Sequence, residues 1–286
     1  METRPVTLCR AYEGSCIVLS TKHAKSGALS APFWNTLKAS MIECPVDTDL
    51  LGSFSSTGSR AGNAIECARR KCQMSLRRLG EKVKFALASE GSFGPHPFLP
   101  GRASDFEVLY FIDRKHGFQL HLSCLSAKTN FAMKAVGSME ELREFAAKAL
   151  FPTHGLILRP NRSVDPTLVF KGVDSEGALE SAFRECVKHS ADRKAWVETD
   201  MRAMFNPTRM EVIAELGGRL AERLAALCPK CRTPGWGRVE MLPEMDYGDC
   251  AGAVETGGAE VHGCVKCGHE ERMGWGGGVE RRARIW

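Results

Sequence analysis

Short apolar runs separated by polar, turn-rich segments dominate the pattern along residues 16–200. The runs CIVLS (16–20) and FALA (85–88) predict buried strands, because continuous apolar runs of this length are typical of strands covered on both faces. After the loop TKHAKSG, a helix is expected through Phe33 and Leu37. Apolar residues then recur at helical spacing from 61 to 79, and Gly80 suits the end of that helix.

The same alternation continues further along the chain. FEVLYFI (106–112) and FQLHLSC (118–124) predict an antiparallel hairpin, since the second run has apolar residues at every other position. Ser138 and Glu141 form a capping-box pattern before another apolar helix. GLILR, TLVF and AWVET are short strand candidates, and a further amphipathic helix lies between the last two. Alternating strands and helices predict an α/β fold, a mixed sheet flanked by helices.

The domain organisation follows from where this alternation stops. Asn206 and Pro207 are suited to the N-cap and the first position of a helix that reaches Leu227. We therefore expect four parts. They are an N-terminal extension (1–14), an α/β domain (15–205), a connecting helix (206–227) and a cysteine-rich module (228–286).

Composition narrows the class of protein. The chain has 286 residues, 43% hydrophobic and 26% charged, as in an ordinary globular protein. No apolar stretch reaches the roughly 18 to 20 residues of a membrane span, and the first 15 residues lack the apolar core of a signal peptide. The expectation is a cytoplasmic protein without a membrane partner. A net charge of +5 is compatible with anionic small molecules or nucleic acid.

The cysteines carry the most specific pattern. Of 12 cysteines, the last five lie between residues 228 and 267. Cys228, Cys231, Cys264 and Cys267 form two Cys-x-x-Cys pairs, which predict a tetrahedral zinc site. Four thiolates leave no open position on the metal, so this zinc is expected to be structural. Cys250, His262 and His269 are spare candidates near the same site.

The stretch FALASEGSFGPHP (85–97) raises a second candidate site. Gly91, Gly94, Pro95 and Pro97 predict that the strand ends close to Glu90. In open α/β sheets, ligands bind at the carboxyl ends of the strands, so Glu90 is a candidate functional carboxylate. The alternative is a solvated residue at the start of a loop.

Three motifs in order, VLSTKHAKSGAL (18–29), SRAGNAIECARRK (59–71) and FALASEGSFG (85–94), resemble the inosine/xanthosine triphosphate pyrophosphatase superfamily. The resemblance implies Mg²⁺-assisted attack of water on a nucleoside triphosphate. It makes Glu90 the acidic residue that holds metal or activates water. Phosphate contacts are expected from the first loop and from the strand end, at Thr21, Lys22, Lys25 and Ser92. The chain departs from the pattern at Ser59, where relatives carry a carboxylate. Asp47 and Asp49 either compensate as Mg²⁺ ligands or are turn residues.

Longer strings extend over nearly the whole chain. DTDLLGSFSSTG, ASEGSFGPHP, TNFA, ETDMRAMFNPTRM and the trailing cysteine pairs resemble a bacterial family of unknown function with a C-terminal zinc ribbon. Within ETDMRAMFNPTRM, Glu198 and Asp200 are expected to join the Mg²⁺ site, with Asp200 a candidate catalytic group. Arg202 and Arg209 are expected to bind phosphate, because a planar guanidinium can donate two hydrogen bonds to a pair of phosphate oxygens. The alternative is a helix-entry turn with a surface ion pair.

Two functions are compatible with these patterns. The first is Mg²⁺-dependent hydrolysis of a nucleoside triphosphate or a related phosphorylated small molecule. The second is a noncatalytic module whose zinc ribbon contacts nucleic acid or protein.

Overall fold

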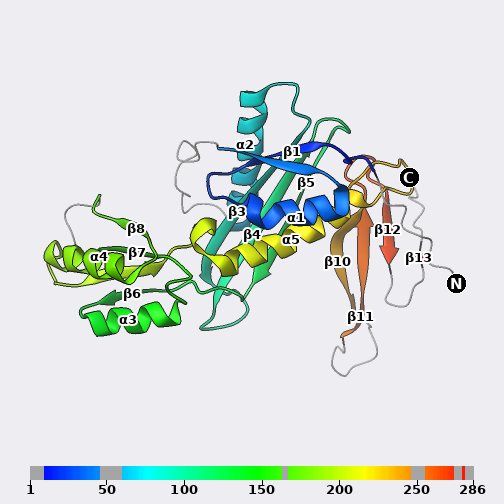
Figure 1. Cartoon of the computed structure of the whole chain (residues 1–286). Helices are drawn as coiled ribbons and strands as arrows, with labels where there is room; N and C mark the ends of the chain where they lie inside the picture. The colour runs from blue at the N-terminus through cyan, green and yellow to red at the C-terminus, as the bar shows by residue number, and fades with distance from the viewer. Residues whose placement is uncertain (1–9, 46–59, 163–166, 246–254, 274–278, 281–286) are drawn as a thin grey trace, which may run out of the picture.

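The computed structural model describes residues 10–45, 60–162, 167–245, 255–273 and 279–280 (Figure 1). Asp47, Asp49, Ser59 and Cys250 lie outside the described residues. Within the described ranges, no helix is long and apolar enough to cross a membrane.

A mixed five-stranded sheet forms the body of the molecule, as the sequence predicted. Its order is β2 (Ser40–Cys44), β1 (Cys16–Ser20), β3 (Phe85–Pro95), β4 (Ala103–Asp113) and β5 (Phe118–Ser126). β1 is parallel to both β2 and β3, whereas β3, β4 and β5 are antiparallel. Helices α1 (Ser26–Leu37) and α5 (Pro207–Ala225) cover one face, and α2 (Arg60–Leu79) covers the other (Figure 1).

The alternation of β3 explains how both faces are covered. Phe85 and Leu87 belong to the core formed with α1 and α5, whereas Ala86 and Ala88 pack against α2. The two helices on the first face approach closely at Gly217, where a Cβ would lie 2.6 Å from Cδ2 of Leu29. A side chain there would require Leu29 to change its position in the core between α1 and α5.

The strand predicted to end near Glu90 instead continues to Pro95, and this expectation was wrong. β4 pairs with β3 over its whole length, from Phe85 opposite Asp113 to Pro95 opposite Ala103. A hairpin partner supplies the hydrogen bonds that a glycine-rich segment alone cannot secure. The pairing with β1, however, stops at Ala88. Glu90 therefore lies beyond the carboxyl end of β1, although it lies inside a strand.

The stretch expected as a single α/β domain carries a second sheet with its own core. β6 (Met133–Val136), β9 (Ala195–Thr199), β7 (Leu156–Pro160) and β8 (Phe170–Val173) form an antiparallel sheet in that order. Helices α3 (Met139–Lys148) and α4 (Glu176–Lys188) share one hydrophobic core with this sheet. We call this unit the small lobe; it lies at the left of Figure 1.

Local sequence signals set the ends of the helices as expected. The hydroxyl of Ser138 accepts a hydrogen bond from the backbone N–H of Glu141 at the start of α3. At the start of α5, Asn206 accepts from the N–H of Arg209, and Pro207 occupies the first turn. Gly80 follows α2 with a φ of +74°, the left-handed conformation that favours glycine.

Helix α5 connects the small lobe to the C-terminal module. It follows the short 3-10 helix η2 (Ala203–Phe205), packs along α1, and ends before the first cysteine pair (Figure 1). The module contains β10 (Gly237–Met245), β11 (Glu255–Gly263), β12 (Glu270–Met273) and β13 (Val279–Glu280), joined as an antiparallel sheet. The hairpin of β10 and β11 accounts for the long segment between the two cysteine pairs.

Candidate functional site

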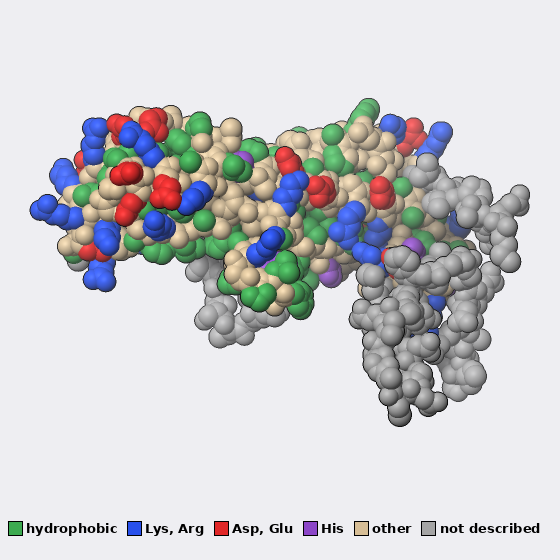
Figure 2. Space-filling view, turned by 90° about the horizontal axis from the view of Figure 1, so that it is seen from below, with side chains coloured by type: hydrophobic (Ala, Val, Ile, Leu, Met, Phe, Trp, Pro, Cys, Tyr) green, Lys and Arg blue, Asp and Glu red, His purple; other side chains and the backbone are tan. Residues whose placement is uncertain are grey.

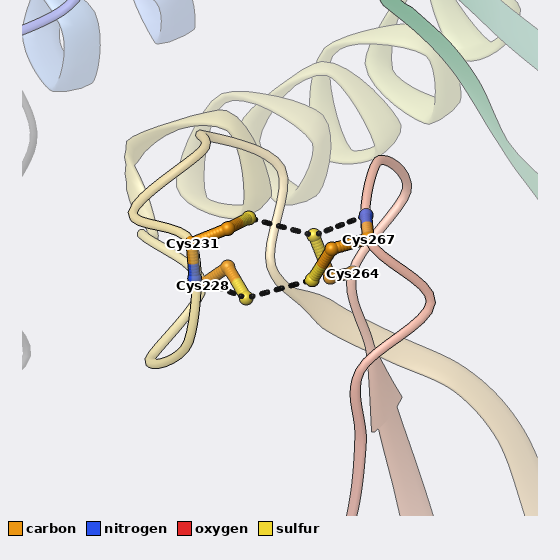
Figure 3. A group of neighbouring side chains, drawn as sticks. All are labelled: Cys228, Cys231, Cys264 and Cys267. Atoms are coloured by element: carbon orange, nitrogen blue, oxygen red, sulfur yellow. Dashed lines mark hydrogen bonds between the residues drawn. The ribbon is translucent and has the colours of Figure 1, made fainter.

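The four paired cysteines lie together at the base of the C-terminal module (Figure 3). Their sulfur atoms all lie within 4.8 Å of one another, and two separations are 3.8 Å (Cys228 to Cys267) and 3.6 Å (Cys231 to Cys264). A tetrahedral metal with metal–sulfur bonds of about 2.3 Å requires sulfur separations of about 3.8 Å. The cluster therefore fits a structural zinc site.

The backbone of each pair explains why the thiols converge. The N–H of Cys231 points at the sulfur of Cys228, and the N–H of Cys267 points at the sulfur of Cys264. Each turn closes on a residue in the left-handed region, Arg232 (φ +60°) and Gly268 (φ +65°). These turns place two thiols of each pair on one side, so that two such pairs facing each other surround one ion.

The histidines near the cluster have other partners. His262 contacts the carboxylate of Glu260, and His269 contacts that of Glu271. Trp236 lies beside both imidazoles, stacked on His269 with ring centroids 5.6 Å apart. The candidate metal group consists of cysteines alone.

The module is also joined to the body. Nζ of Lys266 donates a 2.8 Å hydrogen bond to the carbonyl of His116, in the turn between β4 and β5. Val265 packs against the main core. Gly235, with a φ of +95°, lies against Leu120 and Val265. Loss of the metal would therefore disturb one end of the central sheet.

A pocket of about 450 Å³ lies between β3 and the small lobe. The residues that line it are Gly91, Ser92, Phe93, Phe131, Ile157, Glu198, Thr199, Asp200, Met201, Arg202 and Arg209. Five of the residues predicted from sequence thus meet in one place. They come from segments more than 100 positions apart.

Asp200 holds Arg202 in the pocket wall. Asp200 is fully buried and accepts hydrogen bonds from Nε and Nη2 of Arg202 and from the backbone N–H of Gly172. The guanidinium of Arg202 also lies over the ring of Phe205, with Cζ 4.6 Å from the centroid. Asp200 is therefore a positioning residue, and Arg202 is the partly exposed cation that a ligand would meet.

Arg209 lies across Gly91 and pairs with Glu107 of β4. Nε of Arg209 donates a 2.6 Å hydrogen bond to Oε1 of Glu107, and Nη1 donates to the carbonyl of Met201. A Cβ at position 91 would overlap both Glu107 and Arg209, so only glycine leaves space for this pair. The guanidinium also lies 5.0 Å from the ring centroid of Phe93.

Lys25 is buried behind this pair. Its Nζ donates to the carbonyl oxygen and the hydroxyl of Ser89, at 3.2 and 3.0 Å. Burial, followed by the charge of Arg209, lowers the pKa of Lys25 to about 7. Near neutral pH this lysine exists in both protonation states, so a bound anion would favour its charged form.

Asp105 is a buried carboxyl with no hydrogen-bond partner for either oxygen in the described structure. It lies two residues from Glu107 on the same face of β4. Burial, together with the charge of Glu107, raises the pKa of Asp105 to about 8. The carboxyl is therefore mostly protonated at neutral pH.

Glu90 lies on the opposite face of β3, toward α2. Nζ of Lys71 forms an ion pair of 2.5 Å with Oε2 of Glu90, and the thiol of Cys67 contacts the same oxygen. The side chains of Lys71 and Glu90 are only 12% and 14% exposed. Burial acts to raise the pKa of Glu90, but Lys71 and Lys25 outweigh it and hold the pKa below its usual value.

The expected Mg²⁺ site is not supported. Among the described residues, the cysteine cluster is the one group of three or more side chains able to hold a metal. Glu90 faces α2, whereas Glu198 belongs to the small lobe and accepts a hydrogen bond from Nε1 of Trp196. These two carboxylates therefore do not form a set of oxygen ligands. Asp47 and Asp49, the remaining candidates, lie outside the described residues.

The first loop contains three of the residues expected to contact phosphate, Thr21, Lys22 and Lys25. The hydroxyl of Thr21 is buried and accepts from the N–H of His23, whereas Lys22 is exposed. His23 itself was not expected. Burial, followed by the charges of Lys25, Arg209, Lys71 and Arg202, lowers the pKa of His23 to about 4. The cations that act on His23 come from the loop itself (Lys25), from α2, from α5 and from the segment after β9.

Sequence reasoning also missed the polar groups behind the pocket. Asp105 and Glu107 alternate within an apolar strand, SDFEVLYFID, and this spacing places both carboxyls on one buried face. Lys71 stands in the basic run ARRK of α2, and it turns toward the sheet to pair with Glu90. Lys71 turns inward because a carboxylate lies on the neighbouring strand. The periodicity of a helix does not reveal such a partner.

Comparison with known proteins identifies the family. A family model described as "Domain of unknown function (DUF6671)" matches residues 71–282, which is most of the chain. The chain belongs to this family. The DUF6671 match includes the C-terminal part of α2, the pocket and the four cysteines. No curated protein matches the chain in sequence. A solved structure, "Crystal structure of protein VC0702 from Vibrio cholerae", is similar at 9% identity with a TM-score of 0.30. That similarity covers 46% of this chain and 70% of the other.

Proposed function

We propose that the pocket between β3 and the small lobe binds a nucleotide or a related phosphorylated small molecule, and that the protein hydrolyses this ligand inside the cell. The observation that carries the proposal is the pocket of about 450 Å³, which two arginines, Arg202 and Arg209, line together with Ser92. Two guanidinium groups in one pocket wall favour an anionic ligand.

The shape of the pocket supports a small molecule. Its volume of about 450 Å³ lies within the roughly 300 to 1,000 Å³ typical of ligand sites. Arg202 is held in a fixed orientation by Asp200, and a fixed guanidinium suits the paired oxygens of a phosphate. Phe93, Phe131 and Ile157 supply an apolar wall for the rest of the ligand.

Glu90 is the proposed group that activates water. Its pKa is lower than usual, so the carboxylate is charged at neutral pH and able to accept a proton. It lies next to Gly91 of the pocket wall, although its side chain points to the α2 face. The catalytic role rests on the resemblance to the pyrophosphatase superfamily, and binding and turnover are therefore tested separately.

Binding is tested by calorimetry on the full-length protein with nucleoside mono-, di- and triphosphates, sugar phosphates and inorganic phosphate. We expect Arg202→Gln to weaken binding at least about tenfold, because a charge-assisted hydrogen bond contributes roughly 1.5 to 3 kcal/mol. Arg184→Gln on α4, an exposed arginine paired with Glu180, is the matched control. If no compound binds, or if both variants bind like the wild type, the pocket assignment is wrong.

Hydrolysis is tested by phosphate and pyrophosphate release, with and without added Mg²⁺ or Mn²⁺. Glu90→Gln keeps the shape of the side chain and removes its charge. We expect a loss of about 10² or more in rate. Because Glu90 is the partner of the nearly buried Lys71, the melting temperature should also fall, so both proteins are assayed at a temperature at which they are folded. Binding without turnover in the wild type would retain the ligand site and exclude the hydrolase.

A noncatalytic role is the second candidate, and one observation favours it. Arg202, Arg209 and Lys71 are each already paired with a carboxylate of the protein. In this case, the C-terminal module is the interacting part. Its cysteine turns carry exposed Lys230 and Arg232, and an electrophoretic shift assay that compares the wild type with Lys230→Ala/Arg232→Ala tests a nucleic-acid partner.

We also propose that the ion in the cysteine cluster is zinc, bound as one structural equivalent. Support comes from the all-thiolate ligands and the sulfur separations of 3.6 and 3.8 Å. Metal analysis of the purified protein tests the identity of the ion.

A further inference from the structure

The sheet of the small lobe has one face that its helices do not cover. The strand register places Met133 and Ala135 of β6 on the same face as Trp196 and Glu198 of β9. Ile157 and Arg159 of β7 lie opposite Glu198 and Trp196, and Lys171 of β8 lies opposite Ile157. We call this set the open face. The alternate residues, such as Val197 and Leu158, form the core under α3 and α4.

Trp196 lies at the centre of the open face with its ring held in place. Its Nε1 donates a 3.3 Å hydrogen bond to Oε2 of Glu198. The guanidinium of Arg159 lies over the indole, with Cζ 5.4 Å from the ring centroid. Trp196 is half-buried, and Met133, opposite Glu198 on the same face, is 45% exposed. A partly exposed indole thus lies on the open face, with the guanidinium of Arg159 over the ring.

The two sides of the small lobe differ in charge. On the helices, cations have acidic partners: Arg143 bonds to Glu176 and Glu180, and Lys148 pairs with Glu144. Seen from the side of α3, acidic and basic side chains are intermixed (Figure 2).

On the open face, Arg159 and Lys171 form no ion pair with any described residue. The one acidic side chain of this face, Glu198, is already bonded to Trp196. The open face therefore carries positive charge that the protein itself does not neutralise.

The open face continues into the pocket. Ile157 and Glu198 belong to both, and they lie near Phe93 and Phe131 in the pocket wall. The rings of these two phenylalanines stack with centroids 6.0 Å apart. Aromatic surfaces therefore follow one another from Trp196 toward the pocket, with cations beside them.

We propose that the open face binds single-stranded nucleic acid, with a base stacked at Trp196 and phosphates near Arg159 and Lys171. Aromatic side chains on an uncovered antiparallel sheet stack unpaired bases well, and adjacent cations neutralise the backbone. A duplex hides its base faces and would not reach Trp196. An acidic peptide would use the cations but gain nothing from the aromatic ring. This inference does not depend on the pocket ligand proposed above.

The test measures fluorescence anisotropy of labelled oligonucleotides with hydroxyl ends, about ten nucleotides long, added to the full-length protein. The measurement is made separately with single-stranded RNA, single-stranded DNA, a duplex of the same sequence and a poly-glutamate peptide. We expect either single strand to bind, the duplex and peptide to bind weakly, and Trp196→Ala to reduce affinity about tenfold or more. Trp196→Phe should recover most of the affinity, which would exclude misfolding as the cause.

The charge contribution is tested with a double variant. Arg159→Ala/Lys171→Ala should weaken binding and make the salt dependence of log K shallower by about 1. Arg143→Ala/Lys148→Ala, on the helix side, is the matched control and should bind like the wild type. Lys230→Ala/Arg232→Ala should also leave affinity unchanged.

Three outcomes overturn the inference. One is that no single strand binds the wild type at about 100 µM, since even non-specific binding is typically at or below this level. Another is equal affinity of Trp196→Ala and the wild type. The third is a loss of binding confined to Lys230→Ala/Arg232→Ala, which would assign nucleic acid to the C-terminal module.

Discussion

Nε of Arg209, in the first turn of α5, donates a 2.6 Å hydrogen bond to Oε1 of Glu107 in the central sheet, 102 positions earlier in the chain. Both side chains are buried, at 7% and 1% exposed. The pair joins the start of α5 to the sheet at the place where the small lobe meets the body. Arg209 also lines the pocket, so its pairing with Glu107 affects both the stability of the fold and the shape of the site.

Glu107→Gln should strongly destabilise the protein, because it leaves the buried guanidinium of Arg209 without a counter-charge. Removal of one partner of a buried pair costs about 3 to 5 kcal/mol of unfolding free energy. Glu211→Gln, one turn into α5, breaks an exposed pair with Lys128 and should change stability by less than about 1 kcal/mol. Urea unfolding of both variants checks the difference, and equal effects would contradict the role of the buried pair.

Gly91→Ala should damage both stability and the pocket. The added methyl would overlap Glu107 and Arg209, so the ion pair must move. We expect a loss of about 1 to 3 kcal/mol, the usual range for overpacking. Gly218→Ala is the matched control, since a Cβ there meets nothing within 4 Å and the residue lies inside α5. That variant should be more stable by roughly 0.5 to 1 kcal/mol. Thermal melting of the two proteins would show opposite shifts.

Asp105→Asn should change how stability depends on pH. Burial and Glu107 raise the pKa of Asp105 from 3.8 to about 8. When the pKa of a carboxyl is higher in the folded state than in the unfolded state, the carboxyl begins to destabilise the fold once the pH exceeds its pKa in the unfolded state. This destabilisation grows until the pH reaches the folded-state pKa. The wild type should therefore lose stability between pH 5 and 8, and the variant should lose less.

The measurement is the difference in unfolding free energy between Asp105→Asn and wild type, taken at pH 5 and pH 8. We expect this difference to shift in favour of the variant by at least about 1 kcal/mol, since each unit of pKa shift corresponds to about 1.4 kcal/mol. Parallel pH profiles would mean that Asp105 is ionised in the folded protein.

Cys228→Ser should remove the metal and loosen the C-terminal module. Cys228 is buried and its sulfur lies 3.8 Å from that of Cys267, so the three remaining thiols leave the metal with an incomplete shell. We expect zinc content to fall well below one equivalent. Because Lys266 and Val265 touch the body, the main unfolding transition should also move to lower denaturant. Cys16→Ser, at an exposed single cysteine, should retain both metal and stability. Undiminished zinc in Cys228→Ser would contradict the ligand assignment.

Features that depend on neighbours along the chain could be predicted from sequence. The two Cys-x-x-Cys pairs fix their own turns, so their convergence into one four-cysteine cluster followed from spacing. Asn206 with Pro207 set the start of α5, and Gly80 set the end of α2, because caps are satisfied within a few residues. The mixed sheet flanked by helices followed from alternating apolar runs.

Other features depend on which strands and helices meet, and only the tertiary structure decided them. Lys25 bonds to Ser89, 64 positions away, and Lys71 turns inward because Glu90 lies on the facing strand. β3 continues past Gly91 because β4 pairs with it throughout. The strands of residues 133–199 form a second sheet because they pair with one another and not with the first. Helical and strand periods determine which side of an element is apolar. They do not determine which side chain of another element it will contact. The charge and the pKa of a buried polar group depend on that contact, which forms between segments far apart in the chain.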